Sequence, residues 1–130
     1  MRRLILLDAG PLGIVTKRRG VPDAEACRTW VAHCLRQGAL VFVPAVAYYE
    51  VRRELERMHN TTGLARLEAF CSAVPDRYLL LSDTALRLGC RLWAQALTLD
   101  VQGADRIIAT TNVGHLARFV AADLWTHITP

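Results

Sequence analysis

A short, uninterrupted apolar run near the start of the chain constrains the fold most strongly. Residues 4–7 read Leu-Ile-Leu-Leu, and a turn-forming stretch, Asp-Ala-Gly-Pro, follows directly at residues 8–11. An apolar run without alternation is typical of a strand buried on both faces, as in a parallel sheet. The run is too short to span a bilayer, and the acid that ends it argues against a signal peptide. We therefore predict a buried parallel strand in a cytoplasmic protein with no membrane association.

The rest of the chain alternates between apolar runs and amphipathic segments. Strands that alternate with helices build an α/β fold, and a length of 130 residues allows a single domain, residues 1–130. We predict a three-layer α/β sandwich with a central, mainly parallel sheet of about four short strands. Beyond the first, the predicted strands are residues 39–43, 78–81 and 106–110, and the predicted helices are residues 12–16, 22–37, 45–58, 64–74 and 84–97.

The charged residues permit a nucleic-acid partner without requiring one. Sixteen Lys and Arg residues against twelve Asp and Glu residues give a formal net charge of +4, and every cation except Lys17 is an arginine. Guanidinium groups suit bidentate contacts with phosphate, but net charge alone specifies only non-specific partners. The four cysteines form no Cys-x-x-Cys pair, so we predict that they fill the core.

Oxygen-bearing side chains follow three of the predicted strands. Asp8 ends the first strand, Glu50 lies on the helix after the second, and Thr110, Thr111 and Asn112 come at the end of the fourth. In an open parallel sheet the functional crevice lies beyond the carboxyl ends of the strands. Carboxylates that converge there bind a hard divalent cation such as Mg²⁺ or Mn²⁺. The alternatives are a helix-capping role for Asp8 and a solvated position for Glu50.

Three blocks, in order along the chain, resemble the PIN-domain family. They are Leu-Leu-Asp-Ala-Gly-Pro-Leu-Gly at residues 6–13, the acidic segment at residues 43–55, and Ala-Thr-Thr-Asn-Val-Gly-His-Leu at residues 109–116 with the tail that follows. PIN domains are small α/β domains, and many are metal-dependent ribonucleases. Many short bacterial members are VapC-like toxins of toxin–antitoxin pairs. The resemblance implies an RNA-cleaving hydrolase that uses Mg²⁺ or Mn²⁺, an antitoxin protein as partner, and a homodimer.

The resemblance also implies which residues bind the metal ion. Asp8 corresponds to the first carboxylate, Glu50 to the second, and Asn112 to the last and weaker position. A divalent ion bound there would activate water for attack on an RNA phosphodiester.

Three arginines lie beside Glu50 on the same predicted helix, and two interpretations of them remain open. They either steer the RNA backbone towards the site or form solvated ion pairs with neighbouring glutamates. The arginines are Arg52, Arg53 and Arg57.

The third acidic position of the family has no clear match. Asp105 stands in Ala-Asp-Arg-Ile-Ile-Ala, which superficially copies the family's helical Asp-x-x-Ile-x-Ala-Ala, but it precedes the strand predicted at residues 106–110. Asp100 lies in the loop before it. We predict that the chain lacks the helix and loop that carry this acid, with the junction near residues 93–96. The alternative is that Asp105 or Asp100 takes the role after a local rearrangement.

A missing carboxylate has a functional consequence. A Mg²⁺ site with fewer carboxylates carries less ligand charge and holds a more hydrated, weaker ion. The competing hypothesis is therefore a non-catalytic PIN-like module that binds RNA or an antitoxin-like protein.

Overall fold

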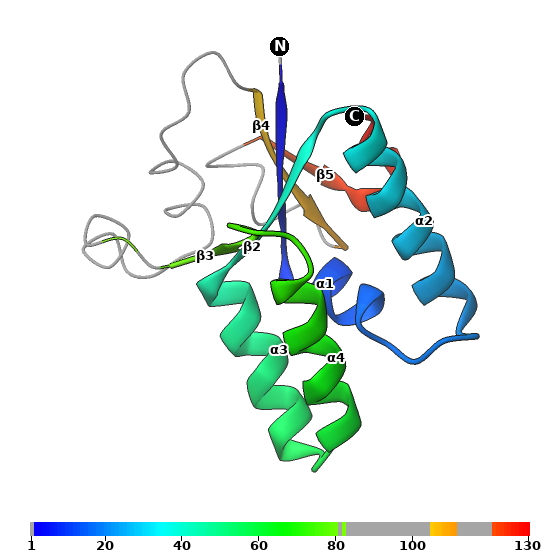
Figure 1. Ribbon diagram of the computed structural model, residues 1–130, viewed down its shortest axis with the longest axis vertical. Coiled ribbons are helices and arrows are strands. Elements are labelled where there is room, and N and C mark those ends of the chain that lie inside the picture. Colours follow the sequence, from blue (N-terminus) through cyan, green and yellow to red (C-terminus); the bar gives the residue numbers. More distant parts are fainter. Residues whose placement is uncertain (1, 81, 83–104, 112–120) are drawn as a thin grey trace.

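A five-stranded, all-parallel sheet forms the centre of the protein in the computed structural model (Figure 1). The structure describes residues 2–80, 82, 105–111 and 121–130. The strand order is β3-β2-β1-β4-β5, so β1 occupies the middle of the sheet. The strands are β1 (Arg3–Leu7), β2 (Leu40–Pro44), β3 (Tyr78–Leu79), β4 (Asp105–Thr110) and β5 (Ala122–Leu124). The predicted α/β class with a central parallel sheet is confirmed, with five strands in place of about four.

The fifth strand, β5, is the one that the sequence did not predict. It is three residues long and contains Asp123, so neither an apolar run nor an alternating pattern marks it. Pairing with β4 defines it, with Ile108 opposite Ala122 and the Ile108 N–H donating to the Ala121 carbonyl at 3.0 Å. Short edge strands of this kind depend on a neighbouring strand, which local sequence does not specify.

The helices agree with the predicted segments to within about one turn. They are α1 (Ala9–Val15), α2 (Pro22–Arg36), α3 (Ala45–Arg57) and α4 (Thr61–Ser72), and a short 3₁₀ turn covers Trp125–His127. The helix predicted at residues 84–97 lies outside the described residues. Figure 1 shows α3 and α4 side by side, extending beyond the edge of the sheet at which α1 begins. No helix in the described parts of the chain combines the length and apolar character needed to cross a bilayer.

Helix α4 starts at Thr61, three residues before the predicted start at residue 64. The Asn60 side chain accepts a hydrogen bond from the Gly63 N–H at 2.8 Å, which satisfies one of the free donors of the first turn. Gly63 leaves room for α3, because a Cβ there would lie 2.8 Å from Asn60 and from the Leu55 side chain.

The two faces of the sheet pack into two hydrophobic clusters. On one face, Ile5 and Leu7 of β1 pack with apolar residues of all four described helices, among them the fully buried Leu67 of α4. On the other face, Leu6 and Ile108 are fully buried. Side chains alternate between the faces along a strand, so burial of both sets explains the unbroken apolar run in β1. Helices packed on a parallel sheet that is buried on both faces agree with the predicted sandwich.

Asp8 starts α1 directly at the end of β1, three residues earlier than predicted. Its carboxylate accepts a hydrogen bond from the Ala9 N–H at 2.7 Å, and its carbonyl accepts the first helical bond from Leu12. Pro11 falls in the first turn, where an N–H has no acceptor within the helix, so its missing donor costs nothing. The Asp-Ala-Gly-Pro stretch is therefore a helix start and not a separate turn.

Gly10 allows α1 to lie against the end of β4. A Cβ built on Gly10 would stand 2.3 Å from Oγ1 of Thr111 and 3.0 Å from its Cβ, which is closer than side chains approach one another. Gly13, one turn further along the same helix, has open space around it, with no atom within 4 Å of a Cβ built there. The close approach at Gly10 brings residues 110 and 111 to the start of α1.

We expect the substitution Gly10→Ala to lower the free energy of unfolding by about 1–3 kcal/mol, because the added methyl group must displace Thr111. Gly13→Ala is the matched control. It adds the same methyl group to open space in the same helix and should leave stability unchanged or raise it by up to about 1 kcal/mol. Urea unfolding of both variants measures the difference. Equal stability of the two would contradict the close packing of α1 on β4.

Candidate functional site

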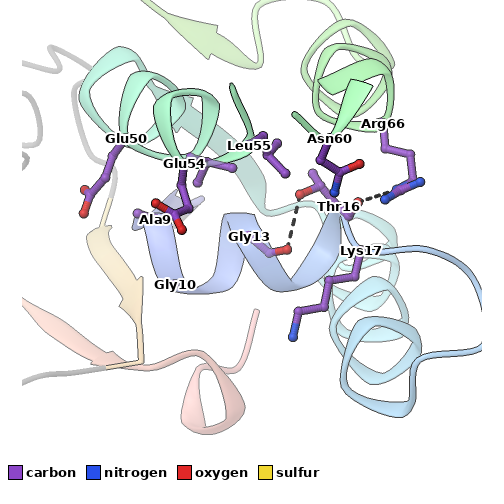
Figure 2. Close-up of a pocket in the computed structure, with 11 residues that line it drawn as sticks. Ala9, Gly10, Gly13, Thr16, Lys17, Glu50, Glu54, Leu55, Asn60 and Arg66 are labelled. Atoms are coloured by element: carbon purple, nitrogen blue, oxygen red, sulfur yellow. Dashed lines mark hydrogen bonds between the residues drawn. The ribbon is translucent and has the colours of Figure 1, made fainter. Parts of the chain in front are cut away.

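A groove opens along α1, with α3 and α4 forming its other wall (Figure 2). Its volume is about 380 Å³, and it begins next to the residues that follow Asp8. The carboxylates of α3 lie at the N-terminal end of α1, whereas cationic side chains lie at the C-terminal end (Figure 2). The lining residues are Ala9, Gly10, Gly13, Thr16, Lys17, Glu50, Val51, Glu54, Leu55, Asn60 and Arg66.

Asp8 is held in place by three short contacts at the end of the central strand. Its backbone N–H donates to the Ala109 carbonyl at 2.9 Å, and one carboxylate oxygen accepts from the Ala9 N–H. The other carboxylate oxygen accepts from the Thr110 hydroxyl at 2.7 Å. An ionised carboxylate offers about four acceptor positions, so these two side-chain bonds leave capacity for a ligand. The helix cap considered as an alternative is present, and it orients the carboxylate without saturating it.

Glu50 lies in the second turn of α3 and is exposed to solvent. It lines the groove together with Ala9 and Gly10, the two residues that directly follow Asp8. The structure therefore places Glu50 and the start of α1, which follows Asp8, on the same part of the groove. Both carboxylates come from elements that begin at the carboxyl edge of the sheet, as the sequence predicted.

Glu54 is a groove residue that the sequence reasoning treated only as an ion-pair partner. It lines the groove one turn after Glu50, and it also accepts two hydrogen bonds from Arg57, at 2.6 and 3.0 Å. These bonds lower the pKa of the Glu54 carboxyl from its ordinary value. The four-residue spacing from Glu50, which places both on one helix face, is the signal that identifies it.

The carboxylates at this end of the groove fit a hydrated magnesium ion better than a closed metal site. Within residues 2–80, 82, 105–111 and 121–130, no group of three His, Cys, Asp or Glu side chains is arranged to hold a metal. Mg²⁺ commonly keeps several waters and binds through one or two carboxylates together with substrate phosphates. Asp8, with unused acceptor positions, and the exposed Glu50 match that donor set.

The structure does not bring Asp105 to this site, so its candidate role in metal binding is corrected. Asp105 begins β4 opposite Arg3 of β1, whereas Asp8 contacts Thr110 at the other end of the same strand. Five residues of strand separate the two ends by roughly 17 Å. The Asp105 carboxylate instead pairs with the Arg3 guanidinium, at 2.8 and 3.0 Å. The other two candidate ligands, Asp100 and Asn112, lie outside the described residues.

The three arginines of α3 do not line the groove that contains Glu50. Arg52 donates to Glu56 at 2.9 Å and to the Tyr48 hydroxyl at 3.1 Å, and these bonds raise its pKa. Arg57 pairs with Glu54 on the groove side of the helix, and Arg53 is exposed. For Arg52 and Arg57 the structure contains the ion pairs that formed one of the two interpretations.

Two cations at the far end of the groove, Lys17 and Arg66, were missed by the sequence reasoning. Lys17 follows α1, and Arg66 comes from α4, where its Nε donates to the Thr16 carbonyl at 2.8 Å (Figure 2). The two are far apart in sequence. Lys17 opens a run of three cations, Lys17-Arg18-Arg19, whereas no such run marks Arg66. Only the packing of α4 against the end of α1 brings them together.

The described cysteines are unsuited to nucleophilic catalysis. Burial raises the pKa of the Cys27 thiol to about 12 and that of Cys71 to about 11. Cys34 is also buried, with a raised pKa. Thiols with such pKa values stay protonated near neutral pH, and the protonated form is a poor nucleophile. The prediction that these residues fill the core agrees with their positions between the sheet and α2 or α4.

Fold and site together define a parallel α/β protein with a polar groove at the carboxyl edge of its sheet. Its groove has carboxylates at one end and cations at the other. The chain matches no protein-family model, no curated protein and no solved structure.

Proposed function

We propose that the protein is a divalent-metal-dependent endoribonuclease whose site is the Asp8 end of the groove. The observation that carries the proposal is the arrangement of two carboxylates at the carboxyl edge of a parallel sheet. Asp8 is fixed at the end of the middle strand, and Glu50 lines the groove beside the next two residues. This edge is where open α/β sheets bind their ligands.

Asp8 and Glu50 have different parts in the proposed reaction. The Ala9 N–H and the Thr110 hydroxyl fix the Asp8 carboxylate, so it presents its remaining lone pairs in one orientation. Glu50 is exposed and reaches the site from the wall opposite α1. Asp8 and Glu50 would hold Mg²⁺ or Mn²⁺, and the ion would supply activation of water and stabilisation of charge on the phosphate. Thr110 acts as a positioning residue because it touches the carboxylate and not the substrate.

The resemblance to VapC-like PIN domains extends the proposal to the biological setting. On that basis the protein acts in the cytoplasm as the toxin of a toxin–antitoxin pair, with RNA as substrate, an antitoxin protein as inhibitor and a second copy as partner. The three blocks described in the sequence support this part.

Cleavage of RNA with and without divalent ions tests the proposed function. Purified protein should cleave a labelled single-stranded RNA in Mg²⁺ or Mn²⁺, and EDTA should stop the reaction. The competing function is a non-catalytic module that binds RNA or an antitoxin-like protein. It is favoured because no group of three His, Cys, Asp or Glu side chains among the described residues is arranged to hold a metal. If the protein binds RNA but leaves it intact in the presence of Mg²⁺ and of Mn²⁺, the result would support the non-catalytic module and contradict the proposed nuclease activity.

A further inference from the structure

A second hollow, lined by three arginines, adjoins the cationic end of the groove. Its volume is about 250 Å³, and Arg19, Arg28 and Arg66 line it. It shares two lining residues, Thr16 and Arg66, with the groove that contains Glu50. The two hollows therefore adjoin at the hydrogen bond between Arg66 and the Thr16 carbonyl. We call this second hollow the arginine pocket.

Two of the three guanidinium groups are held in place by the backbone that joins α1 to α2. Arg66 Nε donates to the Thr16 carbonyl at 2.8 Å. Arg28 donates to the neighbouring Lys17 carbonyl and also to the Glu25 carboxylate, the latter at 2.8 Å. A guanidinium that is already oriented loses less conformational freedom when it binds a ligand. The pocket is therefore prepared for an anion before the anion arrives.

The chemistry of the pocket suits a phosphate group. Arg19 lines the pocket, Lys17 lies beside it, and both side chains are exposed. The Glu25 carboxylate, which pairs with Arg28, neutralises part of this positive charge. Guanidinium groups bind phosphate oxygens through paired N–H donors. The remaining walls are apolar, from Val15, Ala69 and Phe70, and an apolar wall strengthens the attraction between opposite charges.

We propose that the arginine pocket binds a backbone phosphate of RNA, a few nucleotides along the strand from the Asp8 end of the groove. The inference rests on the proposed function, because it assigns the path by which the substrate of that site is bound. An acidic peptide across both hollows would place its carboxylates near Glu54, which is paired with Arg57, and near Glu50, which makes no ion pair within the described residues. An RNA strand would meet the divalent ion proposed for the Asp8 end of the groove, so RNA suits both hollows.

Binding of a fluorescent single-stranded RNA in EDTA, over a range of KCl concentrations, tests the proposal without interference from cleavage. The variants are Arg19→Gln and Arg66→Gln, and the control is Arg36→Gln. The control removes the same charge from an exposed site in the last turn of α2, outside both hollows. Each pocket variant should weaken binding about tenfold and lower the slope of log Kd against log [KCl] by about 0.7, the value for one single-strand phosphate contact. The control should change neither quantity.

Wild-type binding by both pocket variants, or equal weakening by the control, would overturn the proposal. If the pocket variants weaken binding of a poly-glutamate peptide but not of RNA, the pocket serves an acidic peptide and the proposal is wrong. Arg19 is exposed, so Arg19→Gln carries the test even if loss of the Arg66 bond to Thr16 prevents folding. Cleavage by the wild type in Mg²⁺ is scored separately. Weakened binding by the pocket variants without wild-type cleavage supports the pocket and contradicts only the nuclease.

Discussion

The substitution Asp8→Asn should abolish metal-dependent RNA cleavage while leaving the fold intact. It removes the negative charge that would hold the cation. Because a bound cation stabilises the transition state by several kcal/mol, its loss should lower the cleavage rate at least about a hundredfold. Asparagine caps helices as well as aspartate does, so its Oδ1 can still accept from the Ala9 N–H. Its amide nitrogen can donate to the Thr110 hydroxyl, which reverses the direction of the existing bond. Initial cleavage rates in Mn²⁺ and thermal unfolding measure the two effects.

Asp105→Asn is the matched control for this prediction. It makes the same chemical change at the other end of the sheet, where it removes only a partly exposed ion pair with Arg3. Pairs of that kind contribute about 0–1 kcal/mol, and cleavage should stay at the wild-type rate. A large loss of cleavage in Asp105→Asn would show that Asp105 takes part in the reaction. Full activity of Asp8→Asn would show that Asp8 does not.

The substitution Glu50→Gln should have the second-largest effect, a fall in the cleavage rate of about tenfold to a hundredfold. The glutamine keeps the size of the side chain but removes the second charge that would attract the ion. Glu50 is exposed and makes no ion pair within the described residues, so stability should change by less than about 0.5 kcal/mol. Cleavage rates over a range of Mn²⁺ concentrations measure the loss. Excess Mn²⁺ should restore part of the rate, because the variant binds the ion more weakly.

Glu56→Gln on the same helix provides the comparison for Glu50. Glu56 is also exposed, but it pairs with Arg52 and does not line the groove. Its neutralisation should leave cleavage unchanged. If the two variants lose activity equally, the effect arises from the overall charge of α3 and not from a carboxylate at the site.

The sequence predicted the central sheet well because its strands carry a strong local signal. The runs at β1, β2 and β4 are buried on both faces, so each appears as a continuous apolar stretch. β5 lacked such a signal, since its three residues are defined by pairing with β4. The start of α1 was misplaced for a different reason. Asp8 both ends a strand and caps the next helix, and the stretch that joins them was interpreted as a turn.

The same distinction applies to the candidate site: some of its residues are marked by local sequence, whereas others are brought together only by tertiary packing. Asp8 and Glu50 were found because each follows a recognisable strand, and such positions share one edge in a parallel sheet. Thr110 was selected as a strand-end hydroxyl, but its bond to the Asp8 carboxylate depends on the pairing of β4 with β1. A run of three cations at residues 17–19 marks Arg19 in the sequence, but nothing local marks Arg28 or Arg66 as its neighbours in the arginine pocket. Its cations come from three separate parts of the chain, and only the packing of the helices brings them together.

Binding of Mn²⁺ to the wild-type chain tests the central claim most directly, because it needs neither RNA nor turnover. Titration followed by electron paramagnetic resonance counts the bound ions and gives their affinity. We predict a single Mn²⁺ per chain, bound at least about tenfold more weakly by Asp8→Asn and by Glu50→Gln, and unchanged in Asp105→Asn. Absence of Mn²⁺ binding by the wild type, or binding that survives both substitutions undiminished, would contradict a metal site at the Asp8 end of the groove.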